Sequence, residues 1–160
     1  MKTTQTPKNL RPYKVFAIEN GTVIDHVTVG YAIRIIRLLN LPIDNRVVTT
    51  GLNFKSKTMG LKDIIKVENR ELTPEEVSII ALFAPNASIN IIRDFKVYKK
   101  FKVEVPKKID KLVVCPNPKC ITNHERMSTV FYATHNGQLK LKCHYCEKTF
   151  KGEEIKNYNI

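Results

Sequence analysis

The chain has 160 residues, of which 42% are hydrophobic, and it carries a formal net charge of +12. This composition excludes a disordered chain, and no apolar run reaches the roughly 20 residues that a membrane-spanning helix needs. The positive charge predicts attraction to polyanions, namely nucleic acid, nucleotides or an acidic protein surface, although a lysine-rich surface adapted to heat gives the same excess.

The N-terminal segment is polar, and its first dozen residues include two prolines, which predicts a loose arm. It lacks the apolar block of a secretory signal. We therefore expect a soluble, cytoplasmic protein, in a compartment where thiols stay reduced. Strands are predicted over 14–19 and 22–27, because the Asn20-Gly21 pair between them favours a two-residue hairpin turn.

Helical and extended patterns alternate in the next part of the chain. Apolar residues at helical spacing predict a helix over 30–41, which Asn40 and Pro42 end. Runs of β-branched residues predict strands over 46–50 and 63–68, with a loop or a wide hairpin between them.

A second helix is predicted to begin at Thr73 and to end before Pro85. Thr73 suits the capping position, and Pro74 suits the first turn because its missing N–H is not needed there. Glu76 stands where it can close a capping box with Thr73.

Two further strands are predicted over 87–93 and 95–105. From residue 22 to residue 93 the elements follow the order β-α-β-β-α-β, in which two helices cover one face of a largely antiparallel sheet. The expected fold of the N-terminal domain, residues 1–106, is therefore an α+β, ferredoxin-like sandwich.

Residues 107–160 are expected to form a second, small all-β domain, with the boundary in the run 105–109. The stretches 129–133 and 139–142 predict two of its strands. A unit of this size has little core, and it usually needs a metal or another cross-link for stability.

The four cysteines of the chain all lie in this second unit, as a C-x4-C pair, Cys115 and Cys120, and a C-x2-C pair, Cys143 and Cys146. Four thiolates complete a tetrahedron around Zn²⁺ and leave no position open, which is typical of a structural site. Iron in the same four-thiolate site and two disulfides are the alternatives, and disulfides conflict with a reducing compartment.

Three histidines lie near the cysteines in the sequence: His124, His135 and His144. Because four cysteines already fill the coordination shell of a zinc ion, we expect the histidines to be surface residues or neighbours of the ligands. A catalytic zinc site with an open position is the less favoured alternative.

The N-terminal domain offers carboxylate, imidazole, amide and ammonium groups on strands that can be neighbours in one sheet. A carboxylate accepts hydrogen bonds from ribose hydroxyls and ammonium groups pair with phosphates, so this set suits a nucleotide. No phosphate-cradling loop or catalytic motif is present, so we expect a nucleotide to be sensed rather than hydrolysed. The side chains are Asp25, His26, Lys66, Asn90, Lys99 and Lys100.

Six segments together resemble the regulatory chain of aspartate carbamoyltransferase, in order and with that family's spacing. They are 20–26 (Asn-Gly-Thr-Val-Ile-Asp-His), 51–53, 59–69, 84–87, 113–117 and 143–147. The resemblance implies an N-terminal nucleotide-binding domain that pairs as a homodimer and a C-terminal zinc domain that binds the catalytic chain. It also implies that the chain is not an enzyme. CTP, UTP and ATP would act through it on catalytic trimers in pyrimidine synthesis.

The resemblance further implies a set of site residues. Ile18, Ile92 and Phe95 would meet the base, Asp25 and Lys66 would hold the ribose, and His26 and Lys100 would face the triphosphate. Asn117, Tyr145 and Glu147 would contact the catalytic chain. The full nucleotide set is Ile18, Asp25, His26, Lys66, Asn90, Ile92, Phe95, Val97 and Lys100.

Two positions depart from that family's pattern. Phe95 stands where the family often has tyrosine, and Lys119 stands where an asparagine can occur in the contact loop.

A nucleic-acid-binding zinc-ribbon protein is the main alternative function, and the net charge supports it. Against it, the aromatic residues are not arranged with basic residues as a stacking platform.

Overall fold

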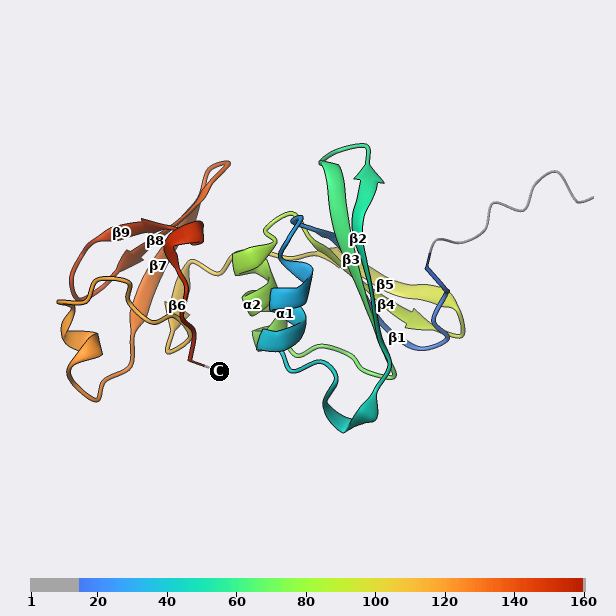
Figure 1. Cartoon of the computed structure of the whole chain (residues 1–160), viewed down its shortest axis with the longest axis horizontal. Coiled ribbons are helices and arrows are strands. Elements are labelled where there is room, and N and C mark those ends of the chain that lie inside the picture. Colours follow the sequence, from blue (N-terminus) through green and yellow to red (C-terminus); the bar gives the residue numbers. More distant parts are fainter. Residues whose placement is uncertain (1–14, 160) are drawn as a thin grey trace, which may run out of the picture.

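The computed structural model describes residues 15–159, so the expected N-terminal arm lies outside the described residues. The N-terminal domain contains a five-stranded antiparallel sheet with the strand order β2-β3-β1-β4-β5 (Figure 1). Its strands are β1 (Gly21–Val27), β2 (Val48–Ser56), β3 (Gly60–Glu68), β4 (Ser88–Arg93) and β5 (Lys96–Lys102). The helices α1 (Ala32–Leu38) and α2 (Pro74–Phe83) lie on one face of this sheet. The predicted ferredoxin-like α+β fold is confirmed, with β5 added at one edge.

The core lies between the sheet and the two helices. Ile24 of β1 is the register partner of Ile65 in β3 and of Ile89 in β4, and all three side chains are buried. Burial of side chains of this size stabilises the fold by about 1.5–3 kcal/mol each. Because side chains alternate along a strand, the neighbours of these residues lie on the opposite face, which neither α1 nor α2 covers.

The start of α2 agrees with the sequence prediction. The Thr73 hydroxyl accepts a hydrogen bond from the backbone N–H of Glu76 at 3.3 Å, and the Glu76 carboxylate accepts one from the N–H of Thr73 at 2.9 Å. This capping box satisfies two N–H groups that have no partner inside the helix.

The predicted hairpin at Asn20-Gly21 is wrong. Residues 15–20 form no strand, and β1 pairs instead with β3 and with β4, so both of its edges are occupied. Gly21 has φ +137°, and a Cβ atom there would lie 2.1 Å from the carbonyl oxygen of Val67. The glycine therefore serves a close approach between β1 and β3, because long-range pairing outweighs the local turn preference.

The sequence predicted either a loop or a wide hairpin between the strands 46–50 and 63–68, and the structure has the wide hairpin. β2 continues to Ser56, β3 begins at Gly60, and the two strands pair over most of their length. A short 3₁₀ helix, η1 (Ile43–Asn45), precedes β2.

The C-terminal domain is all-β, as predicted. Its antiparallel sheet has the order β6-β7-β8-β9, with two 3₁₀ turns, η2 (Ile121–Asn123) and η3 (Gly152–Glu154). The strands are β6 (Lys108–Asp110), β7 (Val130–His135), β8 (Leu139–Cys143) and β9 (Thr149–Lys151). Only β7 and β8 correspond to predicted strands, because the other two have three residues each and carry too short a pattern.

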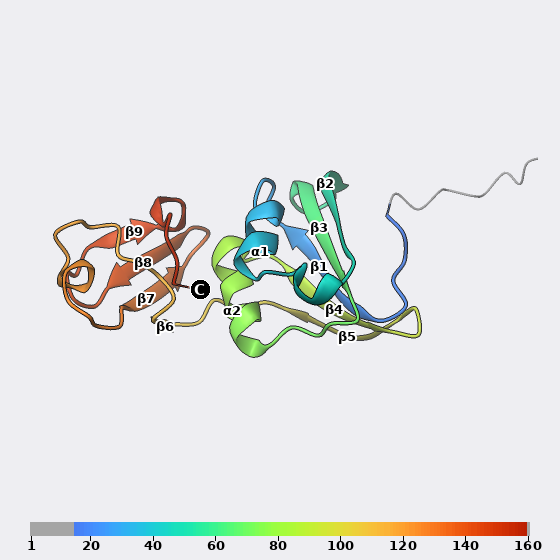
Figure 2. The same ribbon diagram turned by 60° about the horizontal axis from the view of Figure 1, so that its bottom comes forward.

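The two sheets lie on opposite sides of the helices (Figures 1 and 2). α1 and α2 face the C-terminal domain, and the last residues of the chain pack against them: the rings of Phe83 and Tyr158 have centroids 4.8 Å apart. The uncovered face of the five-stranded sheet is consequently turned away from the cysteine-containing domain. None of the helices within residues 15–159 is long and apolar enough to cross a membrane.

Candidate functional site

The four cysteines converge on one point in the C-terminal domain, and their sulfur atoms all lie within 4.8 Å of one another. The sulfurs of Cys115 and Cys146 are 3.7 Å apart, and those of Cys120 and Cys143 are 3.8 Å apart. A disulfide bond would need about 2.05 Å, whereas a tetrahedral zinc ion with bonds of about 2.3 Å places its sulfurs about 3.8 Å apart. The arrangement fits one structural Zn²⁺ ion per chain and not two disulfides.

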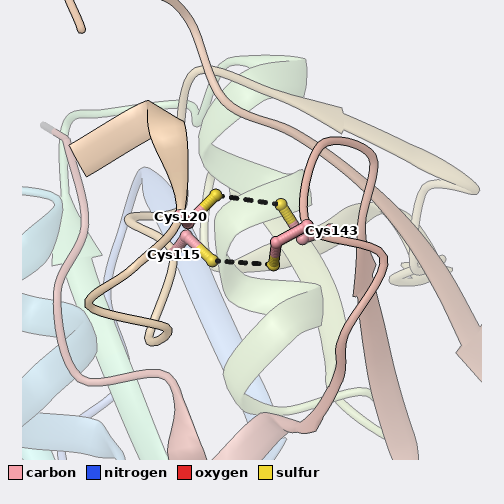
Figure 3. A group of neighbouring side chains, drawn as sticks. Cys115, Cys120 and Cys143 are labelled. Carbon is pink, nitrogen blue, oxygen red and sulfur yellow. Dashed lines mark hydrogen bonds between the residues drawn. The ribbon is translucent and has the colours of Figure 1, made fainter. Parts of the chain in front are cut away.

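Two loops bring the sulfurs together, as Figure 3 shows for the labelled cysteines. Cys115 and Cys120 lie between β6 and β7, while Cys143 ends β8 and Cys146 follows in the next turn. Asn123 braces the first loop, because its side-chain amide donates to the carbonyl of Cys115 at 3.0 Å and to that of Asn117 at 2.8 Å. Sequence reasoning missed this residue, since its role depends on how the loop folds.

Burial raises the pKa of the Cys115 and Cys143 thiols. Burial acts in the same direction on Cys146, but hydrogen bonds from the backbone of Lys148 and the side chain of Asn117 outweigh it and lower the pKa of Cys146 to about 7. Thiolates are the form that binds zinc, so loading the site releases protons and becomes weaker as the pH falls.

The three nearby histidines are not part of the cysteine cluster. His124 lies on the surface, with Nε2 at 2.8 Å from the carbonyl of Pro118. The ring of His144 makes edge contacts with Tyr132 and Tyr145, at centroid distances of 5.9 Å and 5.0 Å. His135 is exposed at the end of β7.

The uncovered face of the N-terminal sheet brings several of the predicted nucleotide residues together. In one row across the sheet, Val23 of β1 is the partner of Lys66 and of Asn90, and Asn90 is the partner of Lys100. Adjacent residues of one row on an antiparallel sheet have Cβ atoms about 4.5–5.5 Å apart. The register therefore gathers an amide and two ammonium groups on one surface.

The neighbouring rows add further predicted residues to this face. Ile92 of β4 is the partner of Val97 in β5, and Asp25 of β1 is the partner of Ser88 in β4. Phe95 lies in the turn between β4 and β5, with 64% of its surface exposed. Its backbone N–H donates to the carbonyl of Glu19 at 2.9 Å, which ties this turn to the segment that carries the buried Ile18.

Asp25 and His26 occupy an irregularity of β1, where the pairing with β3 shifts register between Ile24 and Val27. His26 has φ 57°, and its N–H donates to the Asp25 carboxylate at 2.7 Å. Lys62 of β3 makes an ion pair with that carboxylate at 2.8 Å. Sequence reasoning missed Lys62, although its even spacing from Lys66 along the strand places both on the same face.

Lys66 is turned toward the N-terminal segment. Its ammonium group donates to the carbonyl of Phe16 at 2.6 Å and lies 3.5 Å from the carbonyl of Val15. Burial lowers the pKa of Lys66. The amine expected to hold a ribose thus has backbone partners in the described structure.

A cavity of about 620 Å³ opens beside this face, at the end of β1. His26 and Lys100, both predicted to face a triphosphate, line it together with Lys102, which sequence reasoning missed. The remaining wall comes from Thr58, Met59, Pro85, Asn86, Ser88 and Phe101. Two lysines and an imidazole make the cavity suitable for an anion.

The three residues predicted to contact a catalytic chain lie close to the cysteine cluster. Asn117 is buried in the first cysteine loop, where its side-chain oxygen accepts from the N–H of Lys119 at 3.2 Å. Tyr145 and Glu147 flank Cys146 on the second loop and are both exposed.

Comparison with known proteins identifies both domains. Residues 13–104 match the family model described as the aspartate carbamoyltransferase regulatory chain, allosteric domain, and residues 107–156 match the one described as its metal binding domain. The aspartate carbamoyltransferase regulatory chain of Pyrococcus abyssi is 52% identical over 144 residues, which are 89% of this chain and 95% of the relative. The corresponding chain of Psychromonas ingrahamii is 49% identical over 137 residues, which are 86% and 91%. This chain therefore belongs to the family of aspartate carbamoyltransferase regulatory chains.

Proposed function

We propose that this chain binds CTP, UTP and ATP on the uncovered face of its N-terminal sheet and thereby controls the catalytic trimers of an aspartate carbamoyltransferase. A regulatory chain is a non-catalytic subunit, so its effect on pyrimidine biosynthesis is exerted through its partner. One observation carries the proposal: the sheet register gathers Asp25, Asn90 and Lys100 beside a cationic cavity.

The chemistry of this face suits a nucleoside triphosphate. The phosphates would enter the cavity lined by His26, Lys100 and Lys102, where ammonium groups act as point charges. The Asp25 carboxylate would accept from ribose hydroxyls. The base would lie near Ile92 and the β4–β5 turn, where the backbone offers donors and acceptors.

Regulation requires that the nucleotide bind two quaternary states with different affinity. A coupling free energy of about 1–3 kcal/mol would change the affinity of the partner site by roughly 5- to 150-fold. The cavity wall includes Pro85 and Asn86, which follow α2, and Lys102, which ends β5 and precedes the chain segment that leads to β6, so both α2 and this segment connect the cavity to the cysteine-containing domain.

The zinc domain is proposed to dock on the catalytic chain through the exposed loops that hold the metal, with Asn117, Tyr145 and Glu147 among the contacts. Zinc binding would organise these loops, because a small all-β unit needs the metal to hold its fold. We infer that residues 1–106 bind the nucleotides and that residues 107–160 bind the catalytic partner.

Homodimerisation through the N-terminal domain is the second assembly step in the proposal. β2 is an edge strand of the sheet, and exposed apolar side chains lie on and beside it: Ile43, Val47, Leu52 and Leu61. An exposed strand edge with apolar neighbours favours pairing with another chain. The proposal includes a cytoplasmic location, where thiols stay reduced and can bind zinc, and no role for nucleic acid or membranes.

The deciding experiment titrates the purified, zinc-loaded chain with CTP, UTP, ATP and cytidine by calorimetry. It then adds the catalytic trimers and measures carbamoyltransferase activity with each nucleotide. We expect triphosphate binding and a changed activity in the mixed complex. An absence of binding at millimolar nucleotide would contradict the proposal, and tight binding of single-stranded RNA with a steep salt dependence would support the nucleic-acid alternative.

A further inference from the structure

A buried carboxylate lies directly behind the proposed nucleotide site. Asp63 of β3 is 0% exposed, and it shares the helix-facing side of the sheet with Ile65. One carboxylate oxygen accepts from the backbone N–H of Gly30 at 3.0 Å, and the other accepts from the N–H of Asn53 at 2.9 Å. A carboxylate in an apolar core is unfavourable unless such hydrogen bonds compensate, so its presence needs a reason.

Asp63 lies where the sheet is irregular on both sides of β3. Toward β1, the register passes from Ile24 opposite Ile65 to Val27 opposite Asp63, so Asp25 and His26 together face one residue. Toward β2, it passes from Gly51 opposite Ile64 to Phe54 opposite Lys62. β1 and β2 therefore each contain one extra residue, which makes a β-bulge in each of them. Asp63 lies in β3, the strand between these two bulges.

The bulge in β1 decides which face of the sheet its residues occupy. In a regular strand with the pairing of Ile24, the alternation would turn His26 toward the helices and Val27 toward the uncovered face. The extra residue instead buries Val27 and leaves His26, with φ 57°, to line the cationic cavity. The position of the imidazole thus depends on the bulge.

We propose that Asp63 is the positioning residue of the effector site, because it holds both bulges in register. Its hydrogen bond to Gly30 fixes the connection that follows β1, and its hydrogen bond to Asn53 fixes the bulge of β2. It touches no nucleotide and acts through Asp25 and His26. The part of this inference that concerns nucleotide binding rests on the proposed function. The part that concerns the position of His26 rests on the geometry alone.

Asp63→Asn is the sharpest variant, since it keeps the shape of the side chain. Two N–H donors need two acceptor oxygens, and an asparagine offers one oxygen and turns an NH₂ group toward the other donor. We expect CTP affinity to fall about tenfold or more, with a smaller loss for cytidine, because the misplaced His26 faces the phosphates. Asp110→Asn removes an exposed carboxylate from β6 and serves as the matched control, with unchanged affinity.

The full zinc-loaded chain is used, and two measurements separate positioning from mere stability. First, the NMR chemical shifts of the His26 imidazole, measured without nucleotide, should differ between Asp63→Asn and the unmodified chain. A folded variant with unchanged His26 signals or unchanged CTP affinity would overturn the inference.

Second, in the unmodified chain, CTP should slow hydrogen exchange at the amides of Gly30 and Asn53. Unchanged exchange in a chain that binds CTP would overturn the inference. If the unmodified chain binds no nucleotide, the proposed function fails, and the His26 signals still decide the positioning role.

Discussion

The guanidinium group of Arg34 lies 5.3 Å from the ring centroid of Tyr158 and 5.0 Å from that of Phe83. It also donates hydrogen bonds of 3.1 Å to the carbonyls of Ile155 and Lys156. One side chain of α1 thereby joins both helices to the end of the chain, where Tyr158 pairs with Val113, two residues before the first cysteine. This contact links the N-terminal domain to the zinc domain.

Replacing Arg34 with methionine should weaken that link. Met keeps most of the aliphatic stem but loses two charged hydrogen bonds, which contribute about 1.5–3 kcal/mol each, and cation–π contacts of about 0.5–1 kcal/mol each. Differential scanning calorimetry should show the two domains unfolding at more widely separated temperatures. Arg37→Met, on the exposed side of the same helix, is the control and should leave the transitions unchanged. Equal behaviour of the two variants would contradict the role of Arg34.

Tyr158 predicts a loss of stability at alkaline pH. Burial raises the pKa of Tyr158 to about 12, against an opposing effect of Arg34, whereas the unfolded chain should show about 10. Between these values the folded state binds the proton more tightly. The stability that this raised pKa of Tyr158 contributes to the folded state is therefore complete below about pH 10, and it is lost as the pH rises toward about 12.

Urea denaturation at about pH 9 and about pH 11 measures this loss. Tyr158→Phe cannot ionise, so it should lose less stability between the two pH values than the unmodified chain. The same loss in both proteins would show that another group is responsible.

Lys100→Met should reduce the affinity for CTP by about tenfold or more, and the affinity for cytidine much less. The reason is that the ammonium group lines the cavity proposed for the phosphates, where a charged hydrogen bond contributes about 1.5–3 kcal/mol. Isothermal titration calorimetry compares the two ligands. Lys140→Met in the exposed part of β8 is the control. A similar loss for CTP and cytidine would exclude a phosphate contact.

Cys115→Ser should abolish zinc binding and assembly with the catalytic chain, while CTP binding remains detectable. The four thiolates come from two separate loops, so the loss of one ligand should unfold the zinc domain. Zinc content and sedimentation with catalytic trimers are the measurements. Assembly of a zinc-free variant would refute this expectation.

Thr122→Val provides a graded comparison for the metal site. The Thr122 hydroxyl donates to the sulfur of Cys120 at 3.2 Å, and groups that hydrogen-bond to metal ligands affect metal affinity by about 10- to 100-fold. Competition with a chelator should place this variant between the unmodified chain and Cys115→Ser. Zinc affinity equal to that of the unmodified chain would show that the hydroxyl has no such role.

The sequence by itself determined those features that depend on residues close together in the chain. The capping box at Thr73 and Glu76 needs three residues of separation, and each cysteine pair needs only one tight loop. The order of helices and strands also followed from local periodicity, which is why the ferredoxin-like fold could be predicted. The family motifs around Asp25 and His26 indicated the residues proposed to bind a nucleotide.

Only the tertiary structure decided what depends on pairing between distant strands. Asn20-Gly21 has the composition of a hairpin turn, yet β3 and β4 occupy both edges of β1, so the glycine serves strand contact instead. The ion pair of Lys62 with Asp25 and the two bulges around Asp63 arise from the same long-range register. Local preferences are small compared with the burial of a whole strand, so tertiary packing prevails wherever the two disagree.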